Sequence, residues 1–145
     1  MTSDRLRHAV IVGIFLIAGC TPFSGMVHDE TLVGPYRLAA ADVDEDMSIC
    51  WSGPGGVCVG DGLPGPTVFA AGYNEKYLVA AVHPRKFPDE PDRVITQYFY
   101  VVRSSDEARK LPYGGIKGPF DEAAYNAEKA RLRLPEFTRT FENLR

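Results

Sequence analysis

The sequence of 145 residues has little excess charge, three cysteines, three histidines and one tryptophan. Its 16 basic residues stand against 19 acidic ones, so it lacks the basic surplus that binding to a phosphate backbone needs, and no nucleic acid partner is expected. It has no G-x-S-x-G elbow, and its glycine-rich stretch lacks the Lys-Ser/Thr ending of a P-loop. Cysteine and histidine are also not spaced as zinc ligands, so neither a metal nor a cofactor is predicted.

An apolar run long enough to cross a membrane is lacking near the N-terminus. Residues 9–19 form an apolar run of 11 residues, preceded by Arg5 and Arg7. A helix of that length spans about 16 Å at roughly 1.5 Å per residue, whereas the hydrocarbon core is about 30 Å thick. A positive segment followed by a short apolar run is typical of a secretory signal, so residues 1–19 are predicted to be a removable signal peptide.

The apolar run ends in Ile17-Ala18-Gly19-Cys20, which resembles the lipobox of bacterial lipoprotein precursors. A branched apolar residue stands three places before the cysteine, and the small residues between them let a signal peptidase approach the backbone. The resemblance implies cleavage after Gly19, a diacylglycerol group with chains such as palmitate on the Cys20 thiol, and acylation of the new N-terminus. Because each buried CH₂ contributes about 0.8 kcal/mol, two or three acyl chains would anchor the protein to a membrane.

The same resemblance implies a location. Thr21 follows the cysteine, where an aspartate usually favours retention in the inner membrane. In a host with two membranes we therefore expect the inner leaflet of the outer membrane, with the domain in the periplasm. Without residues 1–19 the chain has 18 acidic and 14 basic residues, which offers no attraction to anionic lipid. The alternative is a plain secretory signal with Cys20 as an incidental residue.

The rest of the chain divides into a tether and one domain. Residues 20–33 are polar without clear periodicity and are predicted to be a lipidated flexible tether, and residues 34–145 are predicted to be a single small domain. Nine of the fifteen residues in 52–66 are Gly or Pro, which predicts a loop. Strands are predicted at 36–40, 47–51, 67–71, 77–83 and 94–102, the third and fourth as a hairpin, and the last in the sheet interior with both faces covered.

Helical patterns come late in the chain. The segment 104–111 opens with the S-x-x-E form of a capping box, which predicts a turn or two of helix. Asp121 is a favourable N-cap for a longer helix over 122–133, and Phe120 and Tyr125 are placed to form a hydrophobic staple. The sum is an α+β domain, with an antiparallel sheet of about five strands and a C-terminal helix packed on it.

The mature region is also similar, more loosely, to certain small bacterial lipoproteins. The similar stretches run from G-P-Y-R-L at 34–38, through V-F-A-A-G-Y-N-E-K-Y-L-V-A-A-V-H-P at 68–84, to the helix that follows G-P-F-D-E at 118–122. Those lipoproteins have no characterised activity, so this resemblance implies none.

Cys50 and Cys58 are the two cysteines that remain once Cys20 is lipidated. An exported protein occupies an oxidising compartment, so this pair is predicted to form a structural disulfide. Closing the nine-residue loop removes denatured-state entropy worth roughly 2.5 kcal/mol. A redox-active pair would favour C-x-x-C at a helix start, and a zinc site would need two further ligands.

Two further patterns could carry chemistry. The D-V-D-E-D segment, residues 42–46, begins like a calcium loop but lacks the glycine and the bidentate glutamate of that loop, so a solvated acidic turn is predicted. His83 closes a predicted strand, and with Asp89 and Glu90 it is the candidate centre of a small hydrolase. The favoured interpretation of His83 is structural, because no serine near it stands in a recognisable catalytic frame.

We therefore predict a lipid-anchored envelope protein with a binding or structural domain rather than an enzyme. Its expected partners are the membrane, through Cys20, and an envelope protein or polymer. The candidate binding surface comprises the loop 52–66 and the aromatic residues Trp51, Tyr73 and Tyr113. The alternatives are a small hydrolase that uses His83 and an inhibitor of envelope-degrading enzymes.

Overall fold

The computed structural model describes residues 25–60, 62–103 and 115–145. Cys20, the short helix predicted at 104–111 and Tyr113 lie outside these residues. The described part contains two antiparallel sheets and one α-helix, so the predicted α+β class is confirmed. The strands are divided between two sheets, however, whereas the sequence predicts one.

The first sheet, sheet A, is an antiparallel meander in the order β1-β2-β3-β4. Two short 3₁₀ turns connect its later strands, η1 (Asp44–Asp46) and η2 (Pro54–Gly56). β1 and β2 are joined at Gly34, whose φ of 55° is a left-handed conformation that favours glycine. The strands are β1 (His28–Val33), β2 (Tyr36–Ala40), β3 (Ser48–Ser52) and β4 (Cys58–Val59).

The second sheet, sheet B, is antiparallel in the order β8-β7-β6-β5-β9. The predicted hairpin is confirmed as β5–β6, and β7 lies in the sheet interior between β6 and β8 as predicted. The strands are β5 (Val68–Tyr73), β6 (Tyr77–Val82), β7 (Gln97–Val102), β8 (Ile116–Phe120) and β9 (Arg139–Thr140).

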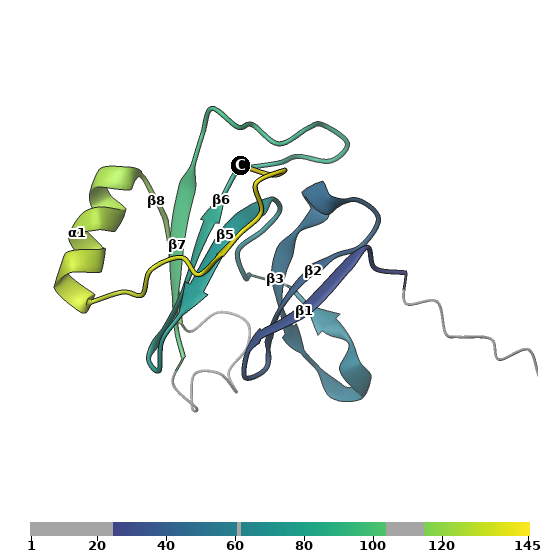
Figure 1. The fold of residues 1–145 in the computed structure, drawn as a ribbon, viewed down its shortest axis with the longest axis horizontal. Coiled ribbons are helices and arrows are strands. Elements are labelled where there is room, and N and C mark those ends of the chain that lie inside the picture. The colour runs from purple at the N-terminus through teal and green to yellow at the C-terminus, as the bar shows by residue number, and fades with distance from the viewer. Residues whose placement is uncertain (1–24, 61, 104–114) are drawn as a thin grey trace, which may run out of the picture.

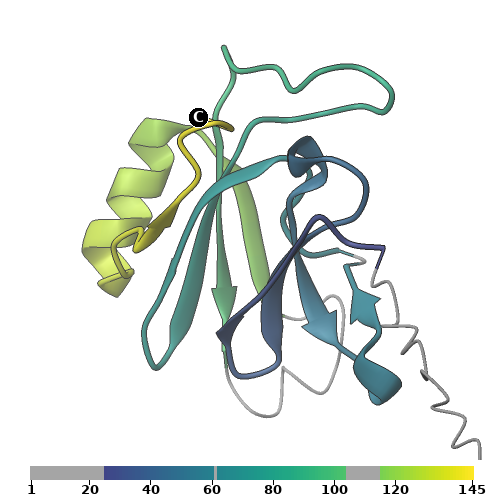
Figure 2. The same ribbon diagram turned by 45° about the vertical axis from the view of Figure 1, so that its right-hand side comes forward.

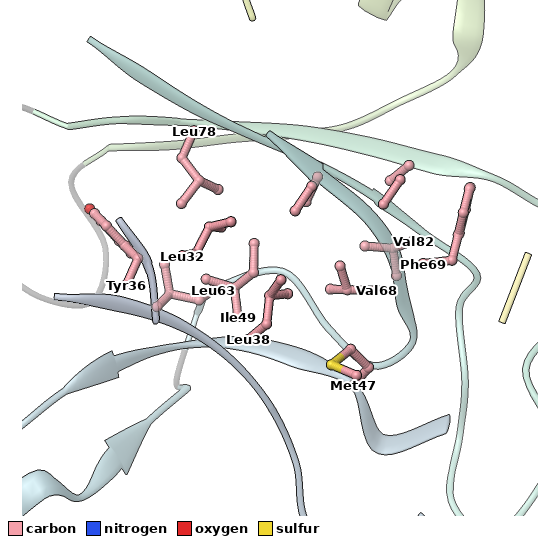
Figure 3. Close-up of a cluster of buried hydrophobic side chains, with 14 of the residues drawn as sticks. Leu32, Tyr36, Leu38, Met47, Ile49, Leu63, Val68, Phe69, Leu78 and Val82 are labelled. Atoms are coloured by element: carbon pink, nitrogen blue, oxygen red, sulfur yellow. The ribbon is translucent and has the colours of Figure 1, made fainter. Parts of the chain in front are cut away.

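Sheet B is the middle of three layers (Figures 1 and 2). One of its faces packs against sheet A, and the helix α1 (Glu122–Leu132) covers the other. Apolar side chains from both sheets fill the space between them (Figure 3). The larger of these side chains are Leu32, Tyr36, Leu38, Met47, Ile49, Leu63, Val68, Phe69, Leu78 and Val82.

β7 shows why the middle layer is apolar on both sides. Val101 belongs to the core shared with sheet A, whereas Tyr100 belongs to the cluster under the helix. Tyr98 stacks on Tyr125 of α1, with ring centroids 4.8 Å apart. Successive residues of a strand point to opposite faces, so large side chains on both faces require a cover on each side. The prediction of a doubly covered strand is confirmed.

The helix begins where the sequence predicts. The side chain of Asp121 accepts a hydrogen bond from the main-chain N–H of Ala124 at 2.8 Å, which satisfies one of the free donors of the first turn. The helix ends at Leu132, and Arg133 adopts the left-handed conformation with φ 56° at the C-cap. In the described part of the chain, no helix is long and apolar enough to cross a membrane.

The prediction of a flexible tether over 20–33 is wrong from His28 onward, because residues 28–33 form the strand β1. The sequence of β1, H-D-E-T-L-V, lacks the alternation of apolar and polar residues that predicts a strand, and Leu32 is its only buried residue. β1 is held by main-chain pairing with β2 and by an ion pair of Asp29 with Arg37 on the neighbouring strand. Cross-strand pairing of this kind leaves no periodic signal in the sequence.

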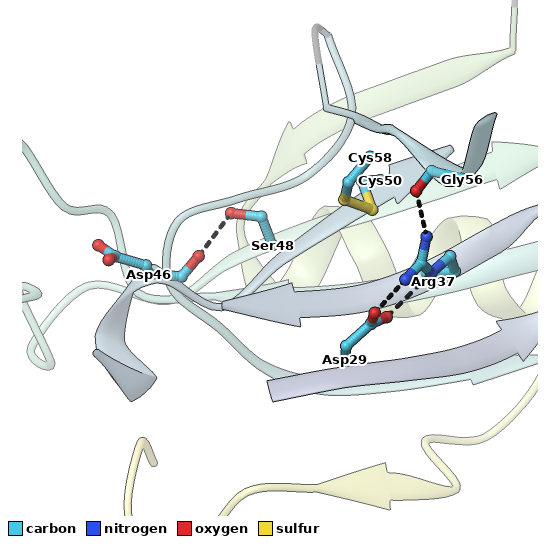
Figure 4. The surroundings of a disulfide bond; sticks show 7 residues. All are labelled: Asp29, Arg37, Asp46, Ser48, Cys50, Gly56 and Cys58. Carbon is cyan, nitrogen blue, oxygen red and sulfur yellow. Dashed lines mark hydrogen bonds and ion pairs between the residues drawn. A yellow bond between two sulfur atoms is a disulfide. The ribbon is translucent and has the colours of Figure 1, made fainter. Parts of the chain in front are cut away.

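The disulfide between Cys50 and Cys58 is present, with Cα atoms 5.4 Å apart (Figure 4). It ties β3 to the glycine-rich segment, which forms η2 and β4 where only a loop was predicted. Arg37 supports the same segment from β2 by donating a hydrogen bond to the carbonyl of Gly56 at 3.0 Å. The disulfide and this hydrogen bond together hold a stretch that has few apolar side chains to bury.

The chain beyond the helix returns to sheet B and closes the core. β9 pairs with β5, Phe141 donates a main-chain hydrogen bond to Phe69 at 2.8 Å, and Leu144 is buried in the main core. The returning chain crosses directly over Gly72, where an added Cβ would collide with the carbonyl of Glu136. Glycine at this position is therefore a packing requirement.

Removal of the disulfide is expected to destabilise the domain. The Cys50→Ala/Cys58→Ala variant should lose roughly 2.5 kcal/mol in its free energy of unfolding, because the nine-residue loop is no longer closed in the denatured state. Urea denaturation measures the difference. The wild-type protein in reducing buffer is the matched control and should unfold at the same urea concentration as the variant. Equal stability of the oxidised wild type and the variant would contradict the expectation.

Tyr125 gives a second test. Its hydroxyl is buried and has no hydrogen-bond partner among the described residues. The Tyr125→Phe variant should therefore be as stable as the wild type or more stable by about 1 kcal/mol, because it removes an unsatisfied polar group. Tyr100→Phe is the matched control, since the Tyr100 hydroxyl donates to Glu128 at 3.0 Å and its loss should cost about 1 kcal/mol. The opposite ranking of the two variants in urea denaturation would show that the Tyr125 hydroxyl is satisfied in the folded protein.

The same residue makes stability depend on pH. Burial, with smaller contributions from Glu136 and Tyr98, raises the pKa of Tyr125 to about 12 from its ordinary value of 10.0. As the pH rises, Tyr125 therefore ionises first in the unfolded chain. The contribution of the protonated Tyr125 to the free energy of unfolding is complete below about pH 10 and is lost as the pH rises towards 12. We expect a fall on the order of 1 kcal/mol per pH unit in this window. Tyr125→Phe should reduce the slope, and an unchanged slope would contradict the assignment.

Candidate functional site

A concave surface lies at the turn of the β5–β6 hairpin, and residues at the C-terminal ends of α1 and β7 also line it. It consists of two adjoining hollows of about 330 and 270 Å³ that share Glu75, Lys76 and Tyr77. The larger hollow is completed by Asn74, Leu132 and Arg133, and the smaller one by Val102 and Arg103. We call this surface the hairpin hollow.

Asn74 fixes the geometry of the hairpin hollow. Its side-chain oxygen accepts hydrogen bonds from the main-chain N–H groups of Lys76 at 2.9 Å and Tyr77 at 2.8 Å, a local turn that asparagine favours. Its amide nitrogen donates to the carbonyl of Arg133 at 3.4 Å, and Arg103 donates to the carbonyl of Asn74. One residue thus joins the hairpin, the helix end and the end of β7.

The lining of the hairpin hollow carries three cations and one carboxylate. Lys76, Arg103 and Arg133 supply the positive charge, and Glu75 supplies the negative charge. Ion pairs among the described residues involve neither Lys76 nor Arg133. The guanidinium carbon of Arg103 lies 5.8 Å from the centroid of the Tyr73 ring, within the range of a cation–π contact.

A neighbouring carboxylate on α1 does not cancel this positive charge, because it is already paired. Glu128 accepts hydrogen bonds from Arg131 at 2.7 and 3.0 Å and from the Tyr100 hydroxyl. The hydrogen bonds from Arg131 lower the pKa of Glu128, and the same contacts raise the pKa of Arg131. Burial, followed by the hydrogen bond to Glu128, raises the pKa of Tyr100. Tyr100 in turn meets Tyr77 edge to face, with ring centroids 6.0 Å apart.

This arrangement can bind an anion beside an aromatic ring. Guanidinium and ammonium groups form strong hydrogen bonds with carboxylates and phosphates, and tyrosine rings offer flat apolar surface next to them. Among the residues that the structure describes, no group of three or more histidine, cysteine, aspartate or glutamate side chains could hold a metal ion.

Two of the three aromatic residues of the predicted binding surface lie in the described residues, one in each sheet. Tyr73 is 43% exposed and lies beside the hairpin hollow, in contact with Arg103. Trp51 lies in sheet A, half-buried against Tyr36 with ring centroids 5.2 Å apart. Tyr113 falls outside the described residues. The structure therefore places Tyr73 in sheet B beside the hairpin hollow and Trp51 in sheet A.

His83 lies at the opposite end of β6 and is 4% exposed. Its Nδ1 donates a hydrogen bond to the carbonyl of Ile95 at 2.8 Å, and its ring stacks on Phe69 with centroids 4.2 Å apart. A carbonyl oxygen can only accept, so this contact fixes the proton on Nδ1. Asp89 and Glu90, which the sequence suggests as its partners, are exposed on the following loop.

The carboxylates of the acidic turn make structural contacts. Asp46 forms an ion pair with Arg85, whose side chain is only 8% exposed, and accepts two long main-chain hydrogen bonds within the turn. Asp44 accepts a hydrogen bond from the side chain of Asn143 at 2.8 Å. The turn predicted to be solvated therefore anchors two other segments, and Asp42 stays exposed at its start.

Lys76, Arg103 and Arg133 were not predicted from the sequence as site residues. The signal for the hairpin itself is local, since Gly72 and Asn74 separate two apolar runs. The two arginines come from the ends of β7 and α1, and nothing in their local sequence indicates that they meet the hairpin.

A scan against protein-family models found no match, and searches of curated proteins and of solved structures found none either. The assignment of a function to this domain therefore rests on its own residues and their geometry.

Proposed function

We propose that this protein is a lipid-anchored envelope protein that binds an anionic group of an envelope polymer or protein at the hairpin hollow. The observation that carries the binding proposal is the convergence of Lys76, Arg103 and Arg133 on one concave surface. The whole chain has a formal net charge of −3, so a local surplus of cations stands out against the rest of the surface.

The geometry of the cations favours a carboxylate or phosphate ligand. The planar guanidinium groups of Arg103 and Arg133 can each offer two parallel N–H donors to such a group, and the ammonium of Lys76 adds a mobile point charge. The three residues come from three elements that Asn74 holds together. Because the backbone of these elements is already fixed, little backbone entropy is lost when a ligand binds.

Tyr73 and Tyr77 add an apolar component to the site. Tyr77 lines both hollows, and Tyr73 lies against Arg103. Tyrosine supplies a large contact area with few rotatable bonds, and its ring can pack against the apolar face of a ligand. We therefore favour a ligand that combines acidic groups with rings or apolar segments, such as an acidic glycopeptide of the cell wall.

The anchoring proposal rests on the motif Ile17-Ala18-Gly19-Cys20 and its spacing from the apolar run. The disulfide between Cys50 and Cys58 supports export, because disulfides persist mainly outside the reducing cytosol. After cleavage the acylated Cys20 would be the N-terminal residue, eight positions before the start of β1 at His28.

Titration of the detergent-solubilised lipoprotein with muropeptides, which carry several carboxylates, tests the binding proposal. Each lost charge-assisted hydrogen bond costs about 1.5–3 kcal/mol, so Lys76→Ala/Arg133→Gly should weaken binding at least tenfold in calorimetry. Glycine suits position 133 because the residue there has positive φ. Lys117→Ala removes a single positive charge from β8, outside the hairpin hollow, and should bind like the wild type. Equal affinity of the double variant and the wild type would refute the assignment.

Intact-mass analysis of the exported protein tests the anchor. We expect the mass of a chain that begins at Cys20 with two or three acyl chains added. The Cys20→Ala variant cannot be acylated at this position and should keep its leader or leave the membrane fraction. An unmodified cysteine in the exported wild type would contradict the proposal.

A further inference from the structure

Exposed apolar side chains gather at the end of the domain opposite the hairpin hollow. β6 runs from the hairpin to His83, a distance of about 20 Å at roughly 3.3 Å per residue. The loop 84–96 follows at that far end, with Phe87 83% and Val94 95% exposed. Among the described residues, five of the eight exposed large apolar side chains lie at this end: Val27, Val43, Phe87, Val94 and Ile95. We call these five residues the apolar end.

Hydrogen bonds and an ion pair place the segments of the apolar end near one another. Val27 donates main-chain hydrogen bonds to Ala40 at 3.0 Å and Ala41 at 3.1 Å, at the entrance to the acidic turn that carries Val43. That turn forms the ion pair of Asp46 with Arg85 on the loop 84–96. Figures 1 and 2 show the start of β1, the turn and the loop at the same end of the molecule.

The loop that carries Phe87 and Val94 is fixed by hydrogen bonds. Arg85 donates to the carbonyl of Asp89 at 2.8 Å, and Asp92 donates a main-chain hydrogen bond to Pro84 at 2.9 Å. Arg93 donates to the carbonyls of Asn143 and Arg145. These contacts hold the backbone while the two apolar side chains point to solvent, so their exposure is built into the fold.

The short distance along the chain from Cys20 to Val27 points to the bilayer as the surface that contacts these side chains. Seven residue steps separate Cys20 from Val27, which span at most about 25 Å when fully extended. If Cys20 is acylated as proposed, Val27 therefore lies within that distance of the bilayer surface. The point where the chain leaves the domain and the exposed apolar side chains are at the same end.

We propose that the apolar end lies in the interfacial zone of the bilayer that holds the acyl chains of Cys20. This inference rests on the proposed lipid anchor. Phe87, Val94 and Ile95 enter the boundary between headgroups and acyl chains, and the hairpin hollow points away from the membrane. An anchored protein held in this way has a defined orientation and presents its binding site to the envelope space.

The charges around the apolar end favour electrically neutral lipid. Seven carboxylates lie on the acidic turn and the loop 84–96 at this end, against three cations: Asp42, Asp44, Glu45, Asp46, Asp89, Glu90 and Asp92, with Arg85, Lys86 and Arg93. A surface with more carboxylates than cations is repelled by anionic lipid, so the contact depends on apolar burial. The interaction should therefore be strongest with zwitterionic lipid and weaken as the anionic fraction increases.

Fluorescence quenching in vesicles tests the orientation. The full lipidated protein is reconstituted in zwitterionic vesicles that contain lipids brominated on their acyl chains. The wild type carries one tryptophan, Trp51, which pairs with Tyr36 at the end of sheet A away from Ala40 and Val27. The Trp51→Phe/Phe87→Trp variant moves the probe to the apolar end. We expect its emission to shift to shorter wavelength and to be quenched at least about twofold more strongly than that of the wild type.

Two further variants complete the test. Trp51→Phe/Val94→Trp probes a second position of the apolar end, so the test does not depend on the folding of one variant. Trp51→Phe/Tyr73→Trp is the matched control beside the hairpin hollow and should be quenched no more than the wild type. Equal quenching of the probes at positions 87, 94 and 73 would overturn the proposed orientation.

The remaining outcomes separate this inference from the proposed function. Intact mass shows first whether Cys20 carries lipid. Acylated protein whose probes at 87 and 94 are not quenched would overturn the membrane contact and leave the anchor standing, whereas protein without acyl chains would overturn both. A shift to shorter wavelength that grows with protein density, without quenching by bromine, would place a second copy on the apolar end and overturn the inference.

Discussion

Burial of apolar surface on both faces of sheet B is the constraint on which the rest of this structure depends. β5, β6 and β7 supply side chains to the core shared with sheet A, and β6 and β7 also supply Val79 and Tyr100 to the cluster under α1. Sheet A and the helix are each held by their own contact with this middle layer. A small domain gains in this way two hydrophobic clusters from one set of strands.

The elements that could be predicted from sequence are those whose signals are local. Asp121 caps α1 through a side chain three residues from its partner, and the β5–β6 hairpin is indicated by glycine and asparagine between apolar runs. β1 and β9 could not be predicted in this way because pairing with other strands creates them. β9 is two exposed residues long, and it exists because Phe141 and Leu144 beyond it pack into the core.

The division into two sheets also has no local signal. The segment that links the two sheets forms main-chain hydrogen bonds with β3 and the residue before it. Ile49 donates to Pro64 at 2.9 Å, and Val68 donates to Met47 at 2.7 Å. The chain turns at this corner through a segment rich in glycine and proline, and those residues predict a loop without showing where it leads. The candidate site depends on the same long-range geometry, because Arg103 reaches the hairpin through the pairing of β7 with β6, and Arg133 through the packing of α1 on sheet B.

The pairing of β9 with β5 has a kinetic consequence. It joins residues about seventy positions apart, Ala70 with Thr140, whereas the hairpins of both sheets join residues close in sequence. Closure of such a long loop is slow compared with hairpin formation, so β5 is expected to spend part of folding as an unpaired edge. An open strand edge with the apolar sequence of β5 can pair with another chain, so aggregation competes with folding until β9 has closed this edge.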